Sequence, residues 1–467
     1  MGVRIQKIKL SKVATHKYAR FDEKFYNIYN KDFHNSIRLK DIFFIKNGLS
    51  LTEFYADERT SKPFIRISDL SYSECMNTEN LVYLSEDYNI REDLITEEDD
   101  IIFATIGNTI GKCNLVKNLK GGTFSNNTVC LKVKDKNKFS PKFLESLLHT
   151  NYMQEKIWGA ISQKSQPNLQ DYDLRNIPFP NISFDNQQQI LATIAPLESE
   201  IASLKATKIP ETDIINKVLG KELGLDWEKL KKIDQIKKVK INFSDLPTYN
   251  DTLRFSCRWN RAVEIQKELQ NQFNQCEILG NHILKTQNGC SPTCGEEGDF
   301  QILGIDSISK STVLSFENPK FTNDKITNFD KYVIHNNDFF VSRGNTIELV
   351  SLASIAEITD ECRETIFPDL MIRITFDDKV DINYLAYIFN SLVGRLYFRN
   401  VTKGKNQTMV KVSEPELKKF IIPMPPKEKQ SKIATLIKEQ IDAQKIIDEQ
   451  ILKKQQQILQ IIENAIR

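Results

Sequence analysis

The sequence predicts an α+β fold: two tandem mixed α/β units, separated and joined by two long antiparallel coiled-coil helices and related by a pseudo-twofold internal repeat. Three observations lead to this prediction. The second half of the chain repeats the first in order. Each half contains short strand-like runs followed by a helix and a Pro-x-Pro segment. Each half then closes with a Gln-rich helix whose apolar residues follow a heptad spacing.

The repeat consists of matched segments at a shift of about 240 positions. Lys46-Asn47-Gly48 matches Gln287-Asn288-Gly289, Gly107-Asn108-Thr109 matches Gly344-Asn345-Thr346, and Pro178-Phe179-Pro180 matches Pro423-Met424-Pro425. A shift that stays nearly constant over the whole chain indicates one duplicated unit with small loop insertions. Such a unit presents two similar surfaces, which suits a target that is itself bipartite.

These signals divide the chain into four regions. Residues 1–185 are predicted to form the first unit, 186–248 a central helical spacer region, 249–426 the second unit, and 427–467 a distal helical spacer region. Residues 208–245 match neither repeat. They contain a charged helical stretch at 226–232 and are bracketed by Pro210 and Pro247. We interpret them as a connector that extends the first helical region.

Composition indicates an ordinary globular protein, with 40% hydrophobic and 27% charged residues among 467. No apolar run approaches the roughly 18 residues that span a bilayer, and the first residues lack the apolar core of a signal peptide. The eight cysteines are scattered without a paired framework, which favours a reducing cytoplasm. The net charge of +2 neither indicates nor excludes nucleic-acid binding, because binding needs only a local basic face.

Within each unit the elements follow the same order. Short β-branched and aromatic runs between Gly, Asn and Asp predict strands, and buried strands at 100–104 and 338–341 lead into the Gly-Asn-Thr turns. Apolar periodicity predicts one helix over about 141–158 and its counterpart over about 382–398. The Pro-x-Pro segments follow. Because proline lacks an N–H and has a fixed φ, they are expected at a sheet edge, where they direct the next helix.

The closing helices carry the clearest local pattern. The proximal apolar seam consists of Ile190, Ile194, Leu197, Ile201 and Leu204. The distal seam consists of Ile433, Ile437, Gln440, Gln444, Ile447, Ile451, Lys454, Ile458 and Ile461, three of which are polar. Polar seam positions reduce self-association and commonly define register or partner. A surface amphipathic helix is one interpretation, but two such helices at equivalent places in the repeat favour an antiparallel pair.

The whole series of elements resembles the specificity subunit of type I restriction–modification systems. The resemblance covers nearly the whole chain and rests on the duplicated order of parts, especially residues 100–112, 338–346 and 423–437. It implies two target recognition domains that each read one half of a split DNA sequence, with the long helices as spacer and docking site for two modification subunits. It further implies no catalysis in this chain, and S-adenosylmethionine, ATP and Mg²⁺ in partner subunits that include restriction subunits.

Catalytic alternatives fit the sequence poorly. Segment 107–113 lacks the glycine spacing of a phosphate-binding loop, and Cys113 stands where Ser or Thr would reach magnesium. Asp369 with Asp377-Asp378-Lys379 imitates a magnesium nuclease, but the first copy has no such acids. Cys290-x-x-x-Cys294 lacks a second ligand pair for zinc. No Gly-x-Gly occurs, and the Asn-Pro-Pro-aromatic segment of adenine methylases is absent.

DNA contact remains. Arg and Lys read guanine, Asn and Gln read adenine, and Lys, Arg, Ser and Thr bind phosphates. The repeated loops supply these types. In the first unit the candidates are Lys46, Asn47, Arg66, Asn108, Thr109, Lys112, Lys164, Ser165 and Gln166. In the second unit they are Thr286, Gln287, Asn288, Arg343, Asn345, Thr346, Lys403, Lys405, Asn406 and Gln407. Any one of them could be a solvated loop residue, but their recurrence after glycines in both copies favours DNA-facing loops.

The sequence therefore predicts a non-catalytic, cytoplasmic subunit that recognises a bipartite sequence in double-stranded DNA, with no bound metal or cofactor of its own. The alternative is a helical interaction scaffold whose units bind protein. Salt dependence separates the two, because about six to ten phosphate contacts would cost roughly 10³–10⁵ in affinity between about 50 and 200 mM salt.

Overall fold

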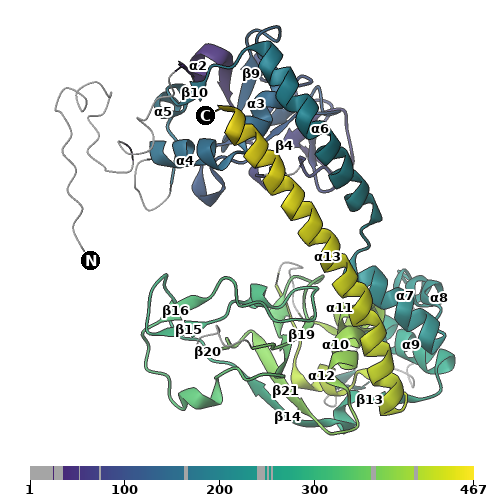
Figure 1. Ribbon diagram of the computed structural model, residues 1–467. Coiled ribbons are helices and arrows are strands. Elements are labelled where there is room, and N and C mark those ends of the chain that lie inside the picture. Colours follow the sequence, from purple (N-terminus) through teal and green to yellow (C-terminus); the bar gives the residue numbers. More distant parts are fainter. Residues whose placement is uncertain are drawn as a thin grey trace. The chain divides into compact units, whose positions relative to one another are not determined.

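The computed structural model describes residues 25, 35–51, 53–72, 75–161, 167–238, 248–249, 252–253, 256–358, 364–403 and 409–466. The chain forms two compact units, shown in Figure 1. Unit 1 comprises Met1–Thr207 together with Ile447–Arg467, and unit 2 comprises Lys208–Ile446.

Unit 1 contains two four-stranded sheets and a pair of short strands. The main sheet has the order β2-β9-β6-β7, with antiparallel neighbours. Its strands are β2 (Phe43–Asn47), β9 (Thr128–Val133), β6 (Ile101–Ala104) and β7 (Cys113–Leu115). The second sheet consists of β3 (Tyr55–Ala56), β5 (Val82–Leu84), β4 (Pro63–Ile65) and β8 (Thr123–Phe124), with β4 and β8 parallel. Strand β1 (Ser36–Arg38) pairs with β10 (Pro178–Pro180), the first Pro-x-Pro segment.

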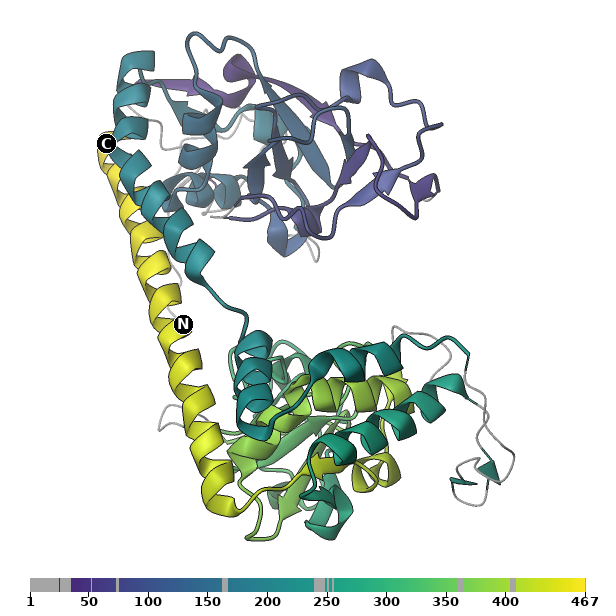
Figure 2. The same ribbon diagram turned by 90° about the vertical axis from the view of Figure 1, so that its right-hand side faces the viewer.

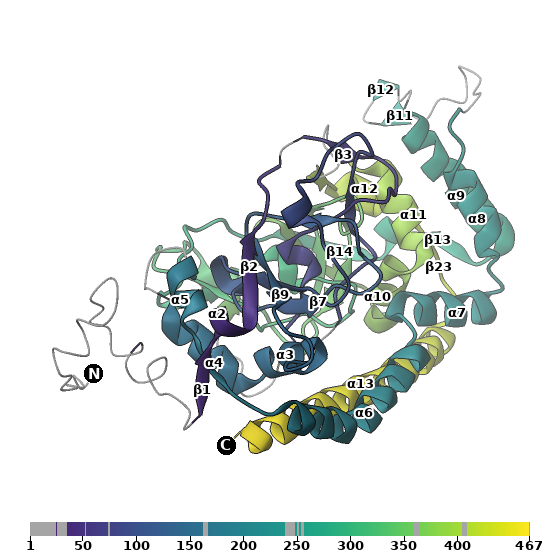
Figure 3. The same ribbon diagram turned by 90° about the horizontal axis from the view of Figure 1, so that it is seen from above.

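The helices of unit 1 flank these sheets. They are α2 (Leu39–Ile42), α3 (Pro141–Leu148), α4 (Asn151–Ala160), α5 (Asp171–Arg175) and α6 (Phe184–Thr207), with 3₁₀ turns η2 (Ile67–Asp69), η3 (Glu92–Leu94) and η4 (Gly107–Thr109). The last part of α13, from Ile447, also belongs to this unit. Viewed as in Figure 3, α6 lies beside that part of α13.

Unit 2 repeats the sheets of unit 1 and adds helices. Its main sheet, in the order β14-β21-β17-β19, consists of β14 (Ile283–Asn288), β21 (Met371–Phe376), β17 (Phe339–Ser342) and β19 (Ala353–Ile355). The smaller sheets are formed by β16 (Lys320–Thr322), β15 (Phe300–Ile302) and β20 (Thr365–Ile366), by β18 (Gly344–Asn345) with β22 (Val410–Lys411), by β13 (Cys276–Ile278) with β23 (Ile421–Pro423), and by β11 (Thr248–Tyr249) with β12 (Thr252–Leu253).

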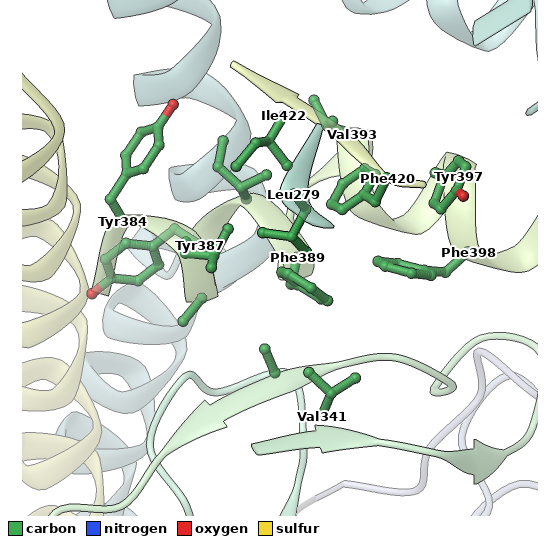
Figure 4. Close-up of a cluster of buried hydrophobic side chains, with 14 of the residues drawn as sticks. Leu279, Val341, Tyr384, Tyr387, Phe389, Val393, Tyr397, Phe398, Phe420 and Ile422 are labelled. Atoms are coloured by element: carbon green, nitrogen blue, oxygen red, sulfur yellow. The ribbon is translucent and has the colours of Figure 1, made fainter. Parts of the chain in front are cut away.

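The helices of unit 2 gather on one side of its main sheet (Figure 2). They are α7 (Glu211–Leu223), α8 (Trp227–Asp234), α9 (Cys257–Gln272), α10 (Ile382–Asn390), α11 (Leu392–Val401), α12 (Glu414–Lys418) and the start of α13 (Lys427–Ile466), with 3₁₀ turns η6 (Leu279–Asn281), η7 (Ile305–Ser307) and η8 (Phe329–Lys331). Their apolar faces meet in the cluster drawn in Figure 4, where Phe389 stacks on Phe398 at 5.1 Å between ring centroids. Each fully buried side chain of this size contributes about 1.5–3 kcal/mol through the hydrophobic effect.

The predicted internal repeat and α+β fold are confirmed by the pairing of the strands. The main sheet of each unit has its four strands in the same relative order. A parallel pair recurs as β4 with β8 and as β15 with β20. Strand β10, which is the first Pro-x-Pro segment, pairs antiparallel with β1, and β23, which ends at the first proline of the second segment, pairs antiparallel with β13, as expected of segments at a sheet edge.

Two local features differ from the sequence prediction. Each predicted helix of about 17 residues is two helices, because Thr150 and Ser391 cap a new helix through their hydroxyl groups. The predicted connector at 208–245 contains α7 and α8, and these pack into unit 2. Ile214, Ile215 and Leu219 of α7 belong to its main core, so this segment contributes to a domain instead of only spacing two.

Candidate DNA interface and helix seam

The Gly-Asn-Thr turn of unit 1 is held in place from both sides. Gly107, at φ 72°, opens the turn η4 and donates its N–H to the carbonyl of Pro167 at 2.8 Å. The hydroxyl of Tyr72 donates to the carbonyls of Asn108 and Ile110, each at 3.0 Å. The Asn108 side chain remains exposed. Tyr72 was not among the residues predicted from the sequence, because its anchoring role comes only from tertiary contact.

Two further candidates of this turn have local contacts. Thr109 donates its hydroxyl to the carbonyl of Ile106 at 2.9 Å. The Lys112 ammonium lies 5.5 Å from the centre of the Tyr72 ring, a cation–π distance. Among the described residues Lys112 has no ion pair. It can therefore reach a phosphate without first breaking a salt bridge.

The equivalent segment of unit 2 forms a short strand. Gly344 and Asn345 form β18, which pairs with β22. Lys411 of β22 also exchanges two backbone hydrogen bonds, of 2.9 and 3.0 Å, with Lys403. The Thr346 side chain is exposed next to this turn. In unit 1 the residue before the Gly-Asn-Thr segment, Ile106, forms a β-bridge to Asn168. In both units the segment thus pairs with residues that stand close in sequence to a polar candidate segment, 162–166 or 404–408.

The other pair of turns depends on close backbone approach. A Cβ on Gly48 would overlap the carbonyl oxygens of Phe124 and Ser125, and one on Gly289 would overlap those of Phe367 and Pro368. Glycine is therefore required at both positions. Each glycine places the preceding asparagine, Asn47 or Asn288, in an exposed position at the end of its strand.

Next to those asparagines the two units differ. Lys46 forms an ion pair of 3.0 Å with Asp93, and hydrogen bonds from Arg91 and Lys46 lower the pKa of Asp93 to about 2. Gln287, in contrast, is buried: it accepts a hydrogen bond from Arg373 at 3.3 Å and donates to the carbonyl of Lys331. In this structure Gln287 acts within its unit, and Lys46 is the side chain closer to solvent.

The remaining described candidates are partly engaged by their own unit. Arg66 pairs with Asp69 at 3.1 Å, Arg343 donates to the carbonyl of Asp369 at 3.4 Å, and Lys403 pairs with Glu416 at 3.0 Å. The pKa of the Glu414 carboxyl group is lowered mainly by a hydrogen bond from Lys418 and further by one from Thr286. Candidates Lys164, Ser165, Gln166, Lys405, Asn406 and Gln407 lie outside the described residues. DNA contact by any of these side chains stays a prediction.

The seam of α6 packs against the end of α13 within unit 1. Ile190 and Ile194 are buried with Ile462 and Ile466, whereas further along α6 Glu200 forms an ion pair with Lys454. Rising numbers on α6 therefore meet falling numbers on α13, so the two helices run antiparallel. The other seam residues of this part are Leu197, Ile201, Leu204, Ile447, Ile458 and Ile461, which are half-buried, and Ile451, which is buried.

The start of α13 departs from the predicted heptad. Ile433, Ile437 and Ile441 are buried in unit 2 at a spacing of four, and Gln440 is exposed. The apolar residues of a helix that packs on a wide domain surface follow the 3.6-residue period of the helix, so the buried position is occupied by Ile441 and not by Gln440. Gln444 accepts a hydrogen bond from the Ile209 N–H at 2.8 Å. Ile441, Ile462 and Ile466 were absent from the predicted seam.

Each closing helix is fastened to its unit by a buried glutamine. Gln187 accepts the N–H of Ser140 at 2.8 Å and donates to the carbonyls of Lys138 and Ile182. Gln430 accepts the N–H of Asp381 at 2.9 Å and donates to the carbonyls of Lys379 and Pro425. Both side chains are 1% exposed. Their equivalent places in the repeat could have identified them, since each lies in a Gln-containing helix start after a Pro-x-Pro segment.

In the described parts of the chain no three or more His, Cys, Asp or Glu residues are grouped so that they could hold a metal ion. The acidic residue Asp377 instead hydrogen-bonds His282 at 3.0 Å, whose other ring nitrogen contacts Glu277 at 2.9 Å. Among the described residues, no helix has the length and apolar character needed to cross a membrane.

Comparison with protein families decides the identity. A family model described as the type I restriction modification DNA specificity domain matches residues 30–211 and 227–456. The chain belongs to this family. It is a DNA-recognition subunit of the type I restriction–modification class, with DNA and methyltransferase subunits as the partners of that class. The two matched segments leave out residues 212–226 of the specificity subunit, which include nearly all of α7.

Three solved structures are similar to the specificity subunit. The S subunit of a type I system from M. genitalium is 13% identical, with a TM-score of 0.38, over 92% of this chain and 95% of that chain. A structure of type I complex assembly is 15% identical, with a TM-score of 0.40, over 93% and 97%. The HsdS subunit of Thermoanaerobacter tengcongensis is 16% identical, with a TM-score of 0.32, over 93% and 96%. No match was found among curated proteins.

Proposed function

We propose that the specificity subunit reads a bipartite sequence in double-stranded DNA, with unit 1 on one half-site and unit 2 on the other. One observation carries this proposal: in both units the Gly-Asn-Thr segment is held by backbone hydrogen bonds, and an exposed asparagine stands directly before a glycine at a close backbone approach. Two equivalent polar surfaces in one chain suit a target with two half-sites.

The chemistry of these surfaces fits DNA. Asn47, Asn108 and Asn288 carry amides that can pair with the N6 and N7 edge of adenine in the major groove. Lys112 and the lysines of loops 162–166 and 404–408 would bind phosphates, which position the protein without reading sequence. Because loops on a rigid framework vary most easily, the same framework can present different reading loops on its two units.

Catalysis would come from partner subunits. Two modification subunits that bind S-adenosylmethionine would dock on α6 and α13 and methylate adenine in each half-site. A restriction subunit with ATP and Mg²⁺ would join the same complex in the cytoplasm. Half-buried apolar side chains along both helices support the docking role, since Ile201 and Leu204 on α6 and Ile447 on α13 retain surface that a partner helix could cover.

The first experiment is methylome sequencing of the host with and without this gene. We expect adenine methylation to disappear from one split, asymmetric motif when the gene is deleted. Replacing loop 404–408 in the restored gene should then change one half of the motif only, and replacing 162–166 should change the other half. A control strain carries the unaltered gene on the same vector. An unchanged methylome in cells whose modification subunit is active contradicts the proposal and favours a protein-binding scaffold.

A further inference from the structure

Unit 2 has a cluster of arginines around a single carboxylate. Asp234, at the end of α8, hydrogen-bonds both Arg399 and Asn400 of α11, the latter at 2.6 Å. Arg261 of α9 donates to the backbone carbonyl of Asp234. Arg258 donates to the carbonyl of Arg399 and, at 3.0 Å, to the hydroxyl of Thr402. The three helices that carry these residues pack together in Figure 3.

Positive charge exceeds negative charge at this place. Lys232, Lys237 and Lys238 are exposed. They lie beside the cluster, because the Cys257 thiol at the start of α9 contacts the carbonyls of residues 236 and 237, just after α8. We name the six side chains the α8–α11 basic surface; they are Lys232, Lys237, Lys238, Arg258, Arg261 and Arg399. Among the described residues, the only carboxylate hydrogen-bonded to any of the six is that of Asp234.

Two details show that the charge is incompletely satisfied. Burial, followed by the charge of neighbouring Arg261, lowers the pKa of Arg258. The Nε of Arg261 is buried without a hydrogen-bond partner. A guanidinium group prefers paired acceptors, and a phosphate supplies oxygens that fit its donors. The surface therefore has the composition of an anion-binding face whose anion comes from another molecule.

The position of the surface indicates which anion. Helix α11 ends at Val401, and two residues later Lys403 exchanges backbone hydrogen bonds with Lys411. Lys411 in turn pairs with Gly344 of the candidate reading turn. The α8–α11 basic surface thus borders the predicted DNA face of unit 2, since Arg258 bonds Thr402, the neighbour of Lys403.

We infer that the α8–α11 basic surface binds the phosphate backbone of the DNA that flanks the half-site read by unit 2. This inference rests on the proposed function and adds to it a sequence-independent contact surface. Arg399, Arg258 and Arg261 would form its inner layer, and the three lysines its outer layer. Such contacts raise affinity for any sequence and orient the protein on the duplex, while base discrimination stays with the loops.

The test uses the complete complex and a duplex that carries the motif identified from the methylome. A triple variant, Lys232→Gln, Lys237→Gln and Lys238→Gln, removes only exposed side chains and keeps the arginine–Asp234 network. Each phosphate contact contributes about 0.9 to the slope of log affinity against log salt concentration. We therefore expect the slope, measured by fluorescence anisotropy from about 50 to 200 mM salt, to decrease by up to about 2.7. The ratio of specific to non-specific affinity should stay the same.

The matched control is Lys267→Gln. Lys267 lies on α9 as well, is 63% exposed, and stands nine residues after Arg258, which at about 3.6 residues per turn is the opposite side of the helix. Its loss should leave the slope unchanged. A triple variant with wild-type affinity and slope overturns the inference, and so does one that loses only assembly with the modification subunits. The proposed function fails separately, by a methylome that does not depend on this gene.

Discussion

Unit 1 and unit 2 share contacts that satisfy buried backbone groups, and they differ in the conformation of the Gly-Asn-Thr segment. The buried glutamine, the glycine at a close backbone approach and the Pro-x-Pro strand recur in both. The turns differ: Gly107–Thr109 is a 3₁₀ turn and Gly344–Asn345 a short strand. The two copies therefore preserve the buried contacts that stabilise their fold, whereas their candidate DNA-reading turns have diverged.

One contact within the two units differs in its chemistry. In unit 1 the ring of His149 hydrogen-bonds the carbonyl of Cys113 at 2.7 Å, and in unit 2 the amide of Asn390 donates to the carbonyl of Ala353 at 2.9 Å. His149 directly follows α3 and Asn390 is the last residue of α10, and both carbonyls lie at the start of the edge strand of the main sheet. The same backbone group is held by a titratable ring in one unit and by a neutral amide in the other.

The added helices distinguish unit 2 most clearly. Asn216 of α7 accepts the N–H of Leu392 at 2.8 Å, and its carbonyl accepts the indole N–H of Trp227. These bonds connect α7 with the first turn of α11 and with the start of α8. Within the described residues unit 1 has no counterpart of this helix pair. Unit 2 thus carries both a larger core and the α8–α11 basic surface.

The largest effect on stability is expected from replacing the buried glutamines Gln187 and Gln430, which should act alike in the two units. Gln187→Leu or Gln430→Leu leaves one N–H and two carbonyls without partners, and each buried unpaired group costs about 1–3 kcal/mol. We expect faster hydrogen–deuterium exchange in peptides of the altered unit only. Gln188→Leu, an exposed neighbour, is the control. Equal exchange in the variant and the control would show that the buried glutamines do not stabilise the contact between the closing helix and its unit.

A smaller effect is expected from the close-approach glycines. Gly48→Ala and Gly289→Ala insert a methyl group against backbone carbonyls, and overpacking of this kind costs about 1–3 kcal/mol. Each variant should weaken methylation through its own half-site, because the displaced turn carries Asn47 or Asn288. Gly295→Ala serves as the control, since its nearest neighbour would lie 3.6 Å away. Methylation at the level of the control in both variants would contradict a role of these turns in reading the half-sites.

The smallest effect is expected in the pH dependence of stability, to which His149 of unit 1 contributes and its counterpart in unit 2, Asn390, does not. Burial, partly offset by the charge of Glu145 and the Cys113 carbonyl, lowers the pKa of His149 below its usual 6.5. A lowered folded-state pKa means that the unfolded chain binds the proton first, so this contribution to stability is complete above about pH 6.5 and is lost as the pH falls below it. Urea unfolding of the full chain between about pH 7.5 and 5.5 should show this loss. His149→Asn, which copies unit 2, should reduce it, and an identical pH profile in wild type and variant would contradict the assignment.

Most of the architecture could be predicted from the sequence, because each weak sequence pattern occurs in both copies and the second occurrence supports the first. Gly48 and Gly289, the Pro-x-Pro strands and the apolar seams each recur at equivalent places, so local requirements of the backbone could be read directly. The helix breaks at Thr150 and Ser391 were missed, since apolar periodicity continues across each cap. Those caps are recognisable only when the hydroxyl is seen to accept a backbone N–H.

By itself the sequence determined the two-unit α+β organisation, the paired helices and the family resemblance, because these depend on local spacing and order. Tertiary structure alone decided that α7 and α8 belong to unit 2, that Gln287 is buried, and that Ile441 takes the place of Gln440. The arginines around Asp234 are a further case: they come from separate helices, α9 and α11. The physical reason is the same throughout, since burial and charge pairing depend on which distant segments meet, and sequence spacing records only near neighbours.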